Sequence, residues 1–515
     1  MNPEADLSAP FGTIAALIRR HAQEAPQRRA LQQDGAALDY AALDALMDRV
    51  AAALQRDGVQ PGEAVALCAG SSLAYAVTYL GALRAGVVVV PLAPGATPDS
   101  LAGMLHDAGA RLLFTDHEVT QALGPRAASV PRVLLDDRPG GAGWQQWLAP
   151  VGTRVPDAVL DADWPFNIIY SSGTTGEPKG IVQPHGMRWA HVQRGATYGY
   201  GPDTVTLLST PLYSNTTLVV FFPTLAYGGT VLLMAKFDAA GYLALAARER
   251  VTHTMLVPVQ YQRLLARPDF GQHDLRSFRM KFCTSAPFSA ALKAEVLARW
   301  PGGLVEFYGM TEGGGTCILE AHLHPDKLHT VGQPAQGHDI RLIDEQGREV
   351  PAGEAGEVVG RSPGMMKGYH GRPEKTREAE WYTPDGQRFI RTGDIGRFDA
   401  EGFLTLFDRR KDMIISGGFN IYPSDLEAEL RQHPAVQDVA VVGVPSEQWG
   451  ETPVAYVVLR EGEALAADAL RDWMNLRVGK TQRLADLRYL AELPRSAIGK
   501  VLKRELREQY AAGRK

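Results

Sequence analysis

Residues 170–180 read YSSGTTGEPKG and directly follow an apolar run, Phe166 to Ile169, that is typical of a buried strand. Two serines, two threonines and three glycines provide hydroxyl donors and a backbone that can expose its N–H groups. Such a loop can surround an anionic phosphate chain, and Lys179 adds a mobile positive charge. Lys179 is followed by Gly180 and not by the hydroxyl residue of a P-loop. A Gly/Ser-rich surface loop is the alternative, but this composition after a strand favours a triphosphate-binding loop.

The same string, SSGTTGxPKG from residue 171, resembles the signature of the adenylate-forming superfamily. This superfamily comprises acyl- and aryl-CoA ligases, peptide-synthetase adenylation domains and beetle luciferases. Further motifs in family order extend the resemblance over essentially the whole chain. It implies ATP-binding roles for Ser171, Ser172, Gly173, Thr174, Thr175 and Lys179, and Thr175 also has a catalytic role in this interpretation.

Composition places the chain among ordinary globular proteins. Its 515 residues are 45% hydrophobic and 22% charged, which predicts several domains. The net charge of −5 argues against a nucleic-acid partner. Three widely spaced cysteines, with no C-x-x-C pair, fit a reducing compartment. No secretory signal and no membrane-spanning window are visible, so we expect a cytoplasmic protein.

Strand-like runs alternate with helical patterns in the first half of the chain, which predicts an α/β fold with parallel layers. Val65 to Leu67 and Val87 to Val90 are two such runs. The resemblance implies a large N-terminal domain, residues 1–409, with two helix-flanked sheets and a small β-barrel that together bind ATP and the acyl group. A smaller, mobile α+β C-terminal domain, residues 410–515, would carry the catalytic lysine.

The acyl pocket is expected where Pro211 to Thr217 introduce an apolar segment. The resemblance places Tyr213, Ser214, Leu218 and Gly309 in this pocket. Many acyl-CoA ligases have a histidine where this chain has Ser214, so the pocket differs there. Tyr213 could equally be a core aromatic residue. Asn215 and Thr216 could bind a ring hydroxyl or cap a helix.

No carboxylate lies between Thr204 and Lys236, where peptide-synthetase domains have an aspartate for the substrate ammonium. A buried ammonium without a counter-charge is costly, so an α-amino acid is disfavoured. An acid with an uncharged aliphatic, alicyclic or aromatic tail is favoured instead.

Two further motifs point to the nucleotide. Residues 284–287, TSAP, resemble the small-residue loop that contacts the adenine and the acyl head, through Ser285, Ala286 and Pro287. Residues 306–312, EFYGMTE, supply an aromatic face for adenine, a hydroxyl for the α-phosphate and a hard oxygen for Mg²⁺. The resemblance implies ATP-binding roles for Glu306, Phe307, Tyr308, Gly309 and Thr311, and it implies that Glu312 is both the metal ligand and a catalytic residue. A strand end with a solvated turn is the alternative.

The later part of the chain supplies the ribose and hinge positions. Asp394 matches the carboxylate that accepts the ribose hydroxyls. Arg409 matches the arginine that contacts ribose and phosphate. Lys411 matches the hinge residue and is counted as catalytic. Ser424 is predicted to cap a helix, with Glu427 completing a capping box.

Lys500 follows a glycine near the end of the chain and resembles the catalytic lysine of the adenylation step. Its cation would bridge the attacking carboxylate and the α-phosphate. By itself such a lysine would be an ordinary surface residue. The CoA-binding residues implied by the resemblance are Ser416, Gly417, Gly418 and Trp449, and Trp449 could also be a plain core or surface aromatic residue.

Three functional classes remain. The first is an AMP-forming acid:CoA ligase that uses ATP, Mg²⁺ and coenzyme A. The second is a stand-alone adenylation enzyme that loads a carrier protein. The third is a degenerate nucleotide-binding protein, which is disfavoured because the candidate residues are all present. The resemblance also allows a homodimer, because members of the superfamily are often dimeric.

Overall fold

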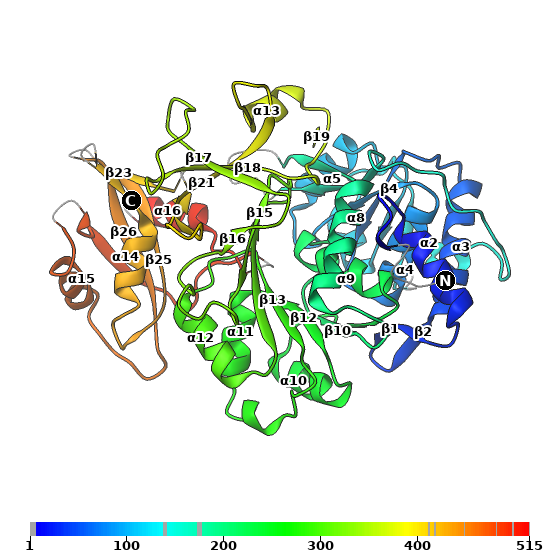
Figure 1. Ribbon diagram of the computed structural model, residues 1–515, viewed down its shortest axis with the longest axis horizontal. Coiled ribbons are helices and arrows are strands. Elements are labelled where there is room, and N and C mark those ends of the chain that lie inside the picture. Colours follow the sequence, from blue (N-terminus) through cyan, green and yellow to red (C-terminus); the bar gives the residue numbers. More distant parts are fainter. Residues whose placement is uncertain are drawn as a thin grey trace. The chain divides into compact units, whose positions relative to one another are not determined.

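The computed structural model describes residues 7–136, 142–171, 178–409, 412–416, 419–446, 449–479, 482–496 and 499–513 (Figure 1). The chain divides into two compact units. Unit 1 comprises Met1–His329, Pro334–Asp339 and Gly360–Ile390, and unit 2 comprises Thr330–Gln333, Ile340–Val359 and Arg391–Lys515. The domain boundary expected between residues 409 and 410 stays a prediction. The mixed α/β character is as predicted.

One sheet of unit 1 contains the strands on both sides of the 170–180 loop. Its order is β19 (Gly368–Tyr369), β9 (Gly180–Pro184), β8 (Pro165–Tyr170), β4 (Val88–Pro91), β3 (Ala64–Cys68), β5 (Leu113–Thr115), β6 (Arg132–Leu134) and β7 (Ala142–Gly143). Strands β3 and β4 are buried at every position. This agrees with their unbroken apolar sequences, because a parallel strand covered on both faces has no solvent side.

A second sheet of unit 1 contains the strands that lead to the other predicted ATP motifs. Its strands follow the order β15 (Thr316–Glu320), β14 (Gly303–Gly309), β13 (Met280–Cys283), β12 (His253–Leu256), β10 (Val205–Leu208), β11 (Thr230–Leu233), β1 (Arg29–Gln33) and β2 (Ala36–Asp39). Strands β13 and β14 are parallel, so the 284–287 and 306–312 motifs emerge at the same edge of the sheet. Strand β15 then returns antiparallel to β14.

Helices α8 (His185–Arg194) and α9 (Asn215–Ala226) pack against each other between these two sheets (Figure 1). Helix α8 contacts β8 and β9, whereas α9 contacts β10, β11 and β12. Helices α2 (Ile14–Glu24), α3 (Tyr40–Arg56) and α4 (Leu73–Arg84) complete the same core. Further helices are α5 (Pro98–Asp107), α6 (His117–Leu123), α7 (Trp144–Trp147), α10 (Ala239–Arg248), α11 (Pro258–Leu265), α12 (Ala290–Arg299) and α13 (Pro373–Glu378).

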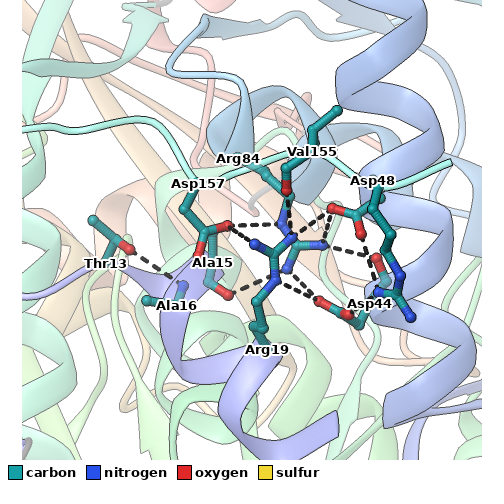
Figure 2. A network of polar contacts seen from close by, with 10 residues as sticks. Thr13, Ala15, Ala16, Arg19, Asp44, Asp48, Arg84, Val155 and Asp157 are labelled. Atoms are coloured by element: carbon teal, nitrogen blue, oxygen red, sulfur yellow. Dashed lines mark hydrogen bonds and ion pairs between the residues drawn. The ribbon is translucent and has the colours of Figure 1, made fainter. Parts of the chain in front are cut away.

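A buried ionic network ties the N-terminal helices to the segment before β8 (Figure 2). The Arg84 side chain is completely buried and pairs with Asp44 at 2.6 Å, with Asp48 at 3.1 Å and with Asp157 at 3.2 Å. Arg19 contacts the same three aspartates. Because the guanidiniums and carboxylates are paired and hydrogen-bonded, the cost of burying their charges is largely compensated.

Unit 2 ends in a compact α+β body. Its sheet has the order β24 (Phe419–Ile421), β23 (Ile414–Ser416), β26 (Gly450–Leu459) and β25 (Val436–Ser446), with β27 (Asp486–Tyr489) paired to β26. Helices α14 (Pro423–Leu430), α15 (Ala467–Asn475) and α16 (Lys503–Ala512) accompany it. The remaining strands of the described chain, not all of which belong to unit 2, are β16 (Gln333–Pro334), β17 (Asp339–Ile343), β18 (Gly356–Arg361), β20 (Glu380–Tyr382), β21 (Arg388–Phe398) and β22 (Leu404–Arg409).

The predicted cap of helix α14 is wrong. The helix begins at Pro423, its N-cap residue is Tyr422, and no side chain caps it. The Ser424 hydroxyl instead donates a hydrogen bond to the carbonyl of Phe407, and Glu427 accepts the N–H of Val441 at 2.9 Å. A proline at the first helical position already lacks one of the N–H groups that a cap would satisfy. Both polar side chains are therefore available for contacts outside the helix.

Candidate functional site

The ends of the phosphate loop are held together by a β-hairpin. Strands β8 and β9 pair antiparallel up to Tyr170 and Gly180. The Ser171 N–H donates to the Lys179 carbonyl at 3.0 Å, and the Lys179 N–H donates to the Ser171 hydroxyl at 3.4 Å. The residues predicted between them, Ser172, Gly173, Thr174 and Thr175, lie outside the described part of the chain. The hairpin presents Ser171 and Lys179 side by side at the base of the loop.

Lys179 and Glu312 both contact Tyr369. The Lys179 ammonium lies 4.4 Å from the centroid of the Tyr369 ring. The Tyr369 hydroxyl donates to Glu312 Oε1 at 2.9 Å. Burial, followed by the negative charge of Glu312, raises the pKa of the Tyr369 phenol above its ordinary value, so the phenol is protonated and acts as the donor. The contacts join the predicted phosphate lysine to the predicted Mg²⁺ ligand.

Sequence reasoning noted Tyr369 only as part of a β-rich section. Its strand, β19, pairs antiparallel with β9, and Tyr369 lies opposite Ile181. This pairing brings a residue far along the chain next to the end of the phosphate loop. In the sequence, the position of Tyr369 is marked only by the preceding Gly368. A glycine followed by an aromatic residue is common in turns, so this pair did not indicate a functional role.

The 306–312 motif runs from the interior to the surface. Glu306 is buried and forms an ion pair with Lys293 of α12, and Lys293 also donates to the Leu328 carbonyl at 2.9 Å. Burial raises the pKa of Glu306, although Lys293 opposes this shift. Tyr308 is half-buried and Gly309 is exposed. The end of the motif is therefore accessible to a nucleotide, whereas the Glu306 carboxylate is engaged inside; its predicted ATP contact stays a prediction.

The 284–287 loop connects the two sides of the expected acyl site. The Thr284 hydroxyl donates to the Phe307 carbonyl at 2.8 Å, next to the 306–312 motif. The Ser285 and Thr216 hydroxyls are hydrogen-bonded at 2.5 Å. Ser285 adopts a left-handed backbone conformation with φ of +80°, which is costly for a residue with a side chain. The structure thus places the predicted adenine loop against the start of α9.

The acyl-pocket candidates have different surroundings. Ser214 is the N-cap of α9, and its hydroxyl accepts the N–H of Thr216 at 3.3 Å. Leu218 is buried in the core between the sheets, and Tyr213 is half-buried. Gly309 ends β14, and a Cβ atom there would lie 3.3 Å from the Thr316 hydroxyl, which is a tight contact. The alternative helix-capping role therefore belongs to Ser214 and not to Asn215 or Thr216.

A second group of candidates belongs to unit 2. The backbone of Asp394 pairs with Arg409 across β21 and β22. Ser416 pairs with Gly450, so β23 brings Ser416 next to Trp449, whose side chain is 46% exposed. The Lys500 N–H donates to the Ser496 hydroxyl at 3.2 Å, which stabilises the loop that carries it. Lys411, Gly417 and Gly418 lie outside the described residues.

The residues present fit a Mg²⁺ ion that is shared with a polyphosphate. The described residues contain no cluster of three or more His, Cys, Asp or Glu side chains that could hold a metal alone. Mg²⁺ commonly uses one or two carboxylates together with substrate phosphates and water. The Glu312 carboxylate, oriented by Tyr369, offers the single protein ligand that such a site needs.

Comparison with known proteins identifies the class to which this fold and site belong. Residues 18–370 match the AMP-binding enzyme family, and residues 425–500 match the AMP-binding enzyme C-terminal domain. The chain is 36% identical over 496 residues to a feruloyl-CoA synthase from an Amycolatopsis species, covering 95% of this chain and 98% of that protein. It is 31% identical over 507 residues to the fatty acid–[acyl-carrier-protein] ligase ScoC of Streptomyces coeruleorubidus, covering 97% and 96%.

A solved structure agrees with these relatives. ATP-bound MatB from Rhodopseudomonas palustris superimposes with a TM-score of 0.89 at 31% identity, covering 97% of this chain and 100% of that one. The chain belongs to the AMP-binding enzyme family. Within this adenylate-forming superfamily it falls in the acid:CoA ligase branch, whose enzymes use ATP, Mg²⁺ and coenzyme A, as predicted. No helix in the described ranges is long and apolar enough to cross a membrane.

Proposed function

We propose that this protein is an ATP-dependent ligase for an aromatic, alicyclic or medium-chain aliphatic carboxylic acid. In the first step, a carboxylate oxygen attacks the α-phosphorus of ATP, the bond to the β-phosphate oxygen breaks, and pyrophosphate leaves. In the second step, the sulfur of coenzyme A attacks the acyl carbon and AMP leaves with the electron pair. The thiol proton passes to solvent. No protein nucleophile is needed, because the AMP leaving group already activates the acyl carbon.

The convergence of Lys179 and Glu312 on Tyr369 carries this proposal. A cation next to the phosphate loop and a carboxylate suited to Mg²⁺ are positioned by one buried phenol. Enzymes that transfer or cleave phosphates of ATP need a cation near the phosphates and a carboxylate that holds Mg²⁺, because catalysis depends on positioning and electrostatic stabilisation. Mg²⁺, when bound, supplies neutralisation of phosphate charge.

The roles of this chain's other residues follow from their chemistry. Thr175 and Thr311 hydroxyls would donate to phosphate oxygens, and Lys500 would bridge the attacking carboxylate and the α-phosphate. Asp394 would accept the ribose hydroxyls. A rotation near Lys411 would then exchange Lys500 for the segment with Ser416 and Trp449, where the exposed indole offers a surface for the nucleotide of coenzyme A. A cytoplasmic location and a homodimer remain predictions.

Carrier-protein loading is the second candidate, because ScoC, whose name assigns it that activity, matches along nearly the whole chain. Both activities share the adenylation half-reaction. Only the thiol acceptor differs, and the exposed Trp449 beside Ser416 favours a nucleotide-bearing thiol.

The test is pyrophosphate release from MgATP across a panel of carboxylic acids, each with and without coenzyme A. We expect a burst without coenzyme A and steady turnover with it, accompanied by acyl-CoA in mass spectrometry. A burst that only a carrier protein converts to turnover would favour the second candidate. Silence with every acid and both acceptors would contradict the proposed function.

A further inference from the structure

Four basic side chains, which we call the basic cluster, gather beside the expected acyl site. Arg188, His191 and Arg194 occupy helix α8 at intervals of three residues, which places them along one side of the helix. His338 joins them from the segment after β16. Burial lowers the pKa of His191 well below its usual value, and Arg188, Arg194 and His338 each lower it further. Arg188, Arg194 and His338 are therefore close enough to His191 to affect its protonation.

No described carboxylate forms an ion pair with any member of the basic cluster. Arg188 is only 1% exposed, and its guanidinium donates to Gln183 while its Nε and Nη1 atoms have no hydrogen-bond partner among the described residues. Its remaining neighbours include the rings of Phe166 and Phe222, at 5.6 Å and 5.9 Å. His191 Nδ1 is likewise buried without a partner in the described part of the chain.

Arg84 shows how this protein otherwise handles a buried guanidinium. It is also 1% exposed, and it pairs with Asp44, Asp48 and Asp157 (Figure 2). A buried cation that lacks such partners is strongly unfavourable, because its lost hydration is not replaced. The basic cluster thus lacks the negative charge that the chain provides around Arg84.

Two hydrogen bonds connect the basic cluster to the expected reaction site. His338 Nδ1 accepts the N–H of Thr316 at 2.9 Å, and Thr316 pairs with Gly309 in the β14–β15 hairpin. Gln183, which holds Arg188, donates to the Thr311 carbonyl at 2.6 Å. Gly309 and Thr311 are the residues assigned to the acyl group and the α-phosphate. Helix α8 also packs on α9, which begins at the expected acyl wall.

The cluster offers hydrogen-bond donors. Burial lowers the pKa of His338 to about 4, so its ring is neutral near pH 7. Because Nδ1 accepts a backbone N–H, the ring proton lies on Nε2, which therefore donates. Arginine can only donate, and its planar guanidinium matches the two oxygens of a carboxylate. A neutral or cationic ligand group would leave the positive charges of Arg188 and Arg194 without a counter-charge.

We propose that the basic cluster binds a second carboxylate of the acid substrate, so that the enzyme activates one end of a dicarboxylic acid. This inference rests on the proposed function and narrows its substrate class. The uncharged tail expected from the sequence followed from the absence of acidic residues between positions 204 and 236. The two arginines lie on α8, and His338 lies after β16, so the basic cluster is outside that window.

Matched acids test the inference. Each set would contain a monoacid, the corresponding diacid and the diacid's monomethyl ester, whose second end is uncharged. Examples are hexanoate, adipate and monomethyl adipate, or cinnamate, 4-carboxycinnamate and its 4-methyl ester. We expect kcat/KM for pyrophosphate release to be at least about 100-fold higher for the diacid in one set, because unpaired buried donors reject analogues strongly. The diacid should also raise Tm without ATP.

Variants of Arg194 distinguish the loss of a positive charge from a general loss of folding. Arg194→Met should lower kcat/KM for the diacid by about 30-fold or more and leave the monoacid within about threefold, because one partner of a buried charge pair is lost. Arg194→Lys should restore part of the diacid activity. Arg299→Met, which removes an exposed arginine paired with Glu295 on α12, is the matched control and should change neither acid.

Each outcome decides the inference. Equal turnover of monoacids or monomethyl esters and of diacids would overturn the inference but would still support the proposed ligase activity. Equal losses for both acids in Arg194→Met would also overturn it. Diacid-specific thermal stabilisation without any pyrophosphate release would support the subsite while contradicting the proposed function. Neither stabilisation nor turnover would overturn both.

Discussion

The Tyr369 hydroxyl donates a 2.9 Å hydrogen bond to Glu312, and the same phenol ring lies 4.4 Å from the Lys179 ammonium. One side chain therefore positions both a cation and an anion of the expected MgATP site. Because the contacts of Tyr369 are with Glu312 and Lys179, which would hold Mg²⁺ and phosphate, we assign it a positioning role. The backbone N–H of Tyr369 donates to the Thr376 hydroxyl at 2.9 Å, which anchors the residue from the other side.

Tyr369→Phe should keep the ring beneath Lys179 and remove the hydrogen bond to Glu312. We expect kcat/KM for pyrophosphate release to fall about tenfold and the Mg²⁺ concentration for half-maximal rate to rise, because a hydrogen bond to a charged group contributes about 1.5–3 kcal/mol. A Mg²⁺ titration at fixed ATP measures both effects. Tyr382→Phe is the matched control, since the Tyr382 hydroxyl donates to Glu380 at the surface. Similar Mg²⁺ curves for both variants would contradict the positioning role.

Ser285 pairs a strained backbone with a hydrogen bond to Thr216. Ser285→Ala and Ser285→Gly both remove the hydroxyl, but only glycine relieves the positive φ. The glycine variant should therefore be more stable than the alanine variant by about 1–2 kcal/mol in urea unfolding. Both should raise the KM for ATP and acid alike. The pair Asp34→Ala and Asp34→Gly, at φ of +47° in an exposed turn, should show the stability difference without any change in KM.

Lys500→Ala should separate the two half-reactions. We expect acyl-AMP formation to fall about 100-fold or more, because a cation at the developing charge is removed. Thioester formation from preformed acyl-AMP should change much less. Rapid-quench measurement of each half-reaction tests this, with Arg504→Ala, an exposed residue of α16, as the control. Equal losses in both half-reactions would remove Lys500 from the adenylation step.

Asp44→Asn should destabilise unit 1 by about 3–5 kcal/mol at pH 7, because it leaves buried guanidiniums without their counter-charge. Burial alone would raise the pKa of Asp44, but Arg84, Arg154 and Arg19 hold it below its ordinary value of 3.8. The carboxylate therefore contributes stability above about pH 4, and this contribution is lost as pH falls through the lower folded pKa. In urea unfolding, the free energy of unfolding of the variant should therefore fall less steeply than that of the wild type as the pH is lowered below about 4.

The exposed pair of Asp203 and Arg279 supplies the control for this network. Asp203→Asn should cost about 1 kcal/mol or less, because solvent screens an exposed ion pair. Losses of equal size for Asp44→Asn and Asp203→Asn at pH 7 would contradict the account of the buried network.

Much of the fold was predictable from local pattern. The apolar run before the phosphate loop is β8, and the runs at Val65 and Val87 belong to β3 and β4. Periodicity and turn residues act over a few neighbouring positions, so the sequence shows them directly. The predicted cap of α14 was wrong because the partner of Ser424 is distant in the sequence. The Ser424 hydroxyl donates to the carbonyl of Phe407, seventeen positions earlier, and a local pattern cannot predict that contact.

The sequence by itself determined the class of enzyme, because its phosphate-loop, adenine, ribose and lysine motifs each lie within a few consecutive residues whose chemistry is legible in order. Only the tertiary structure decided which distant side chains act together. Strand β19 had to pair with β9 before Tyr369 could join Lys179 to Glu312. Helix α8 had to pack between the sheets before Arg188 became a buried cation without an acidic partner among the described residues. Strand pairing and burial depend on contacts between residues that are distant in the sequence. These contacts decide which charged groups are buried and which hydrogen bonds form, and so they define the specificity of the site.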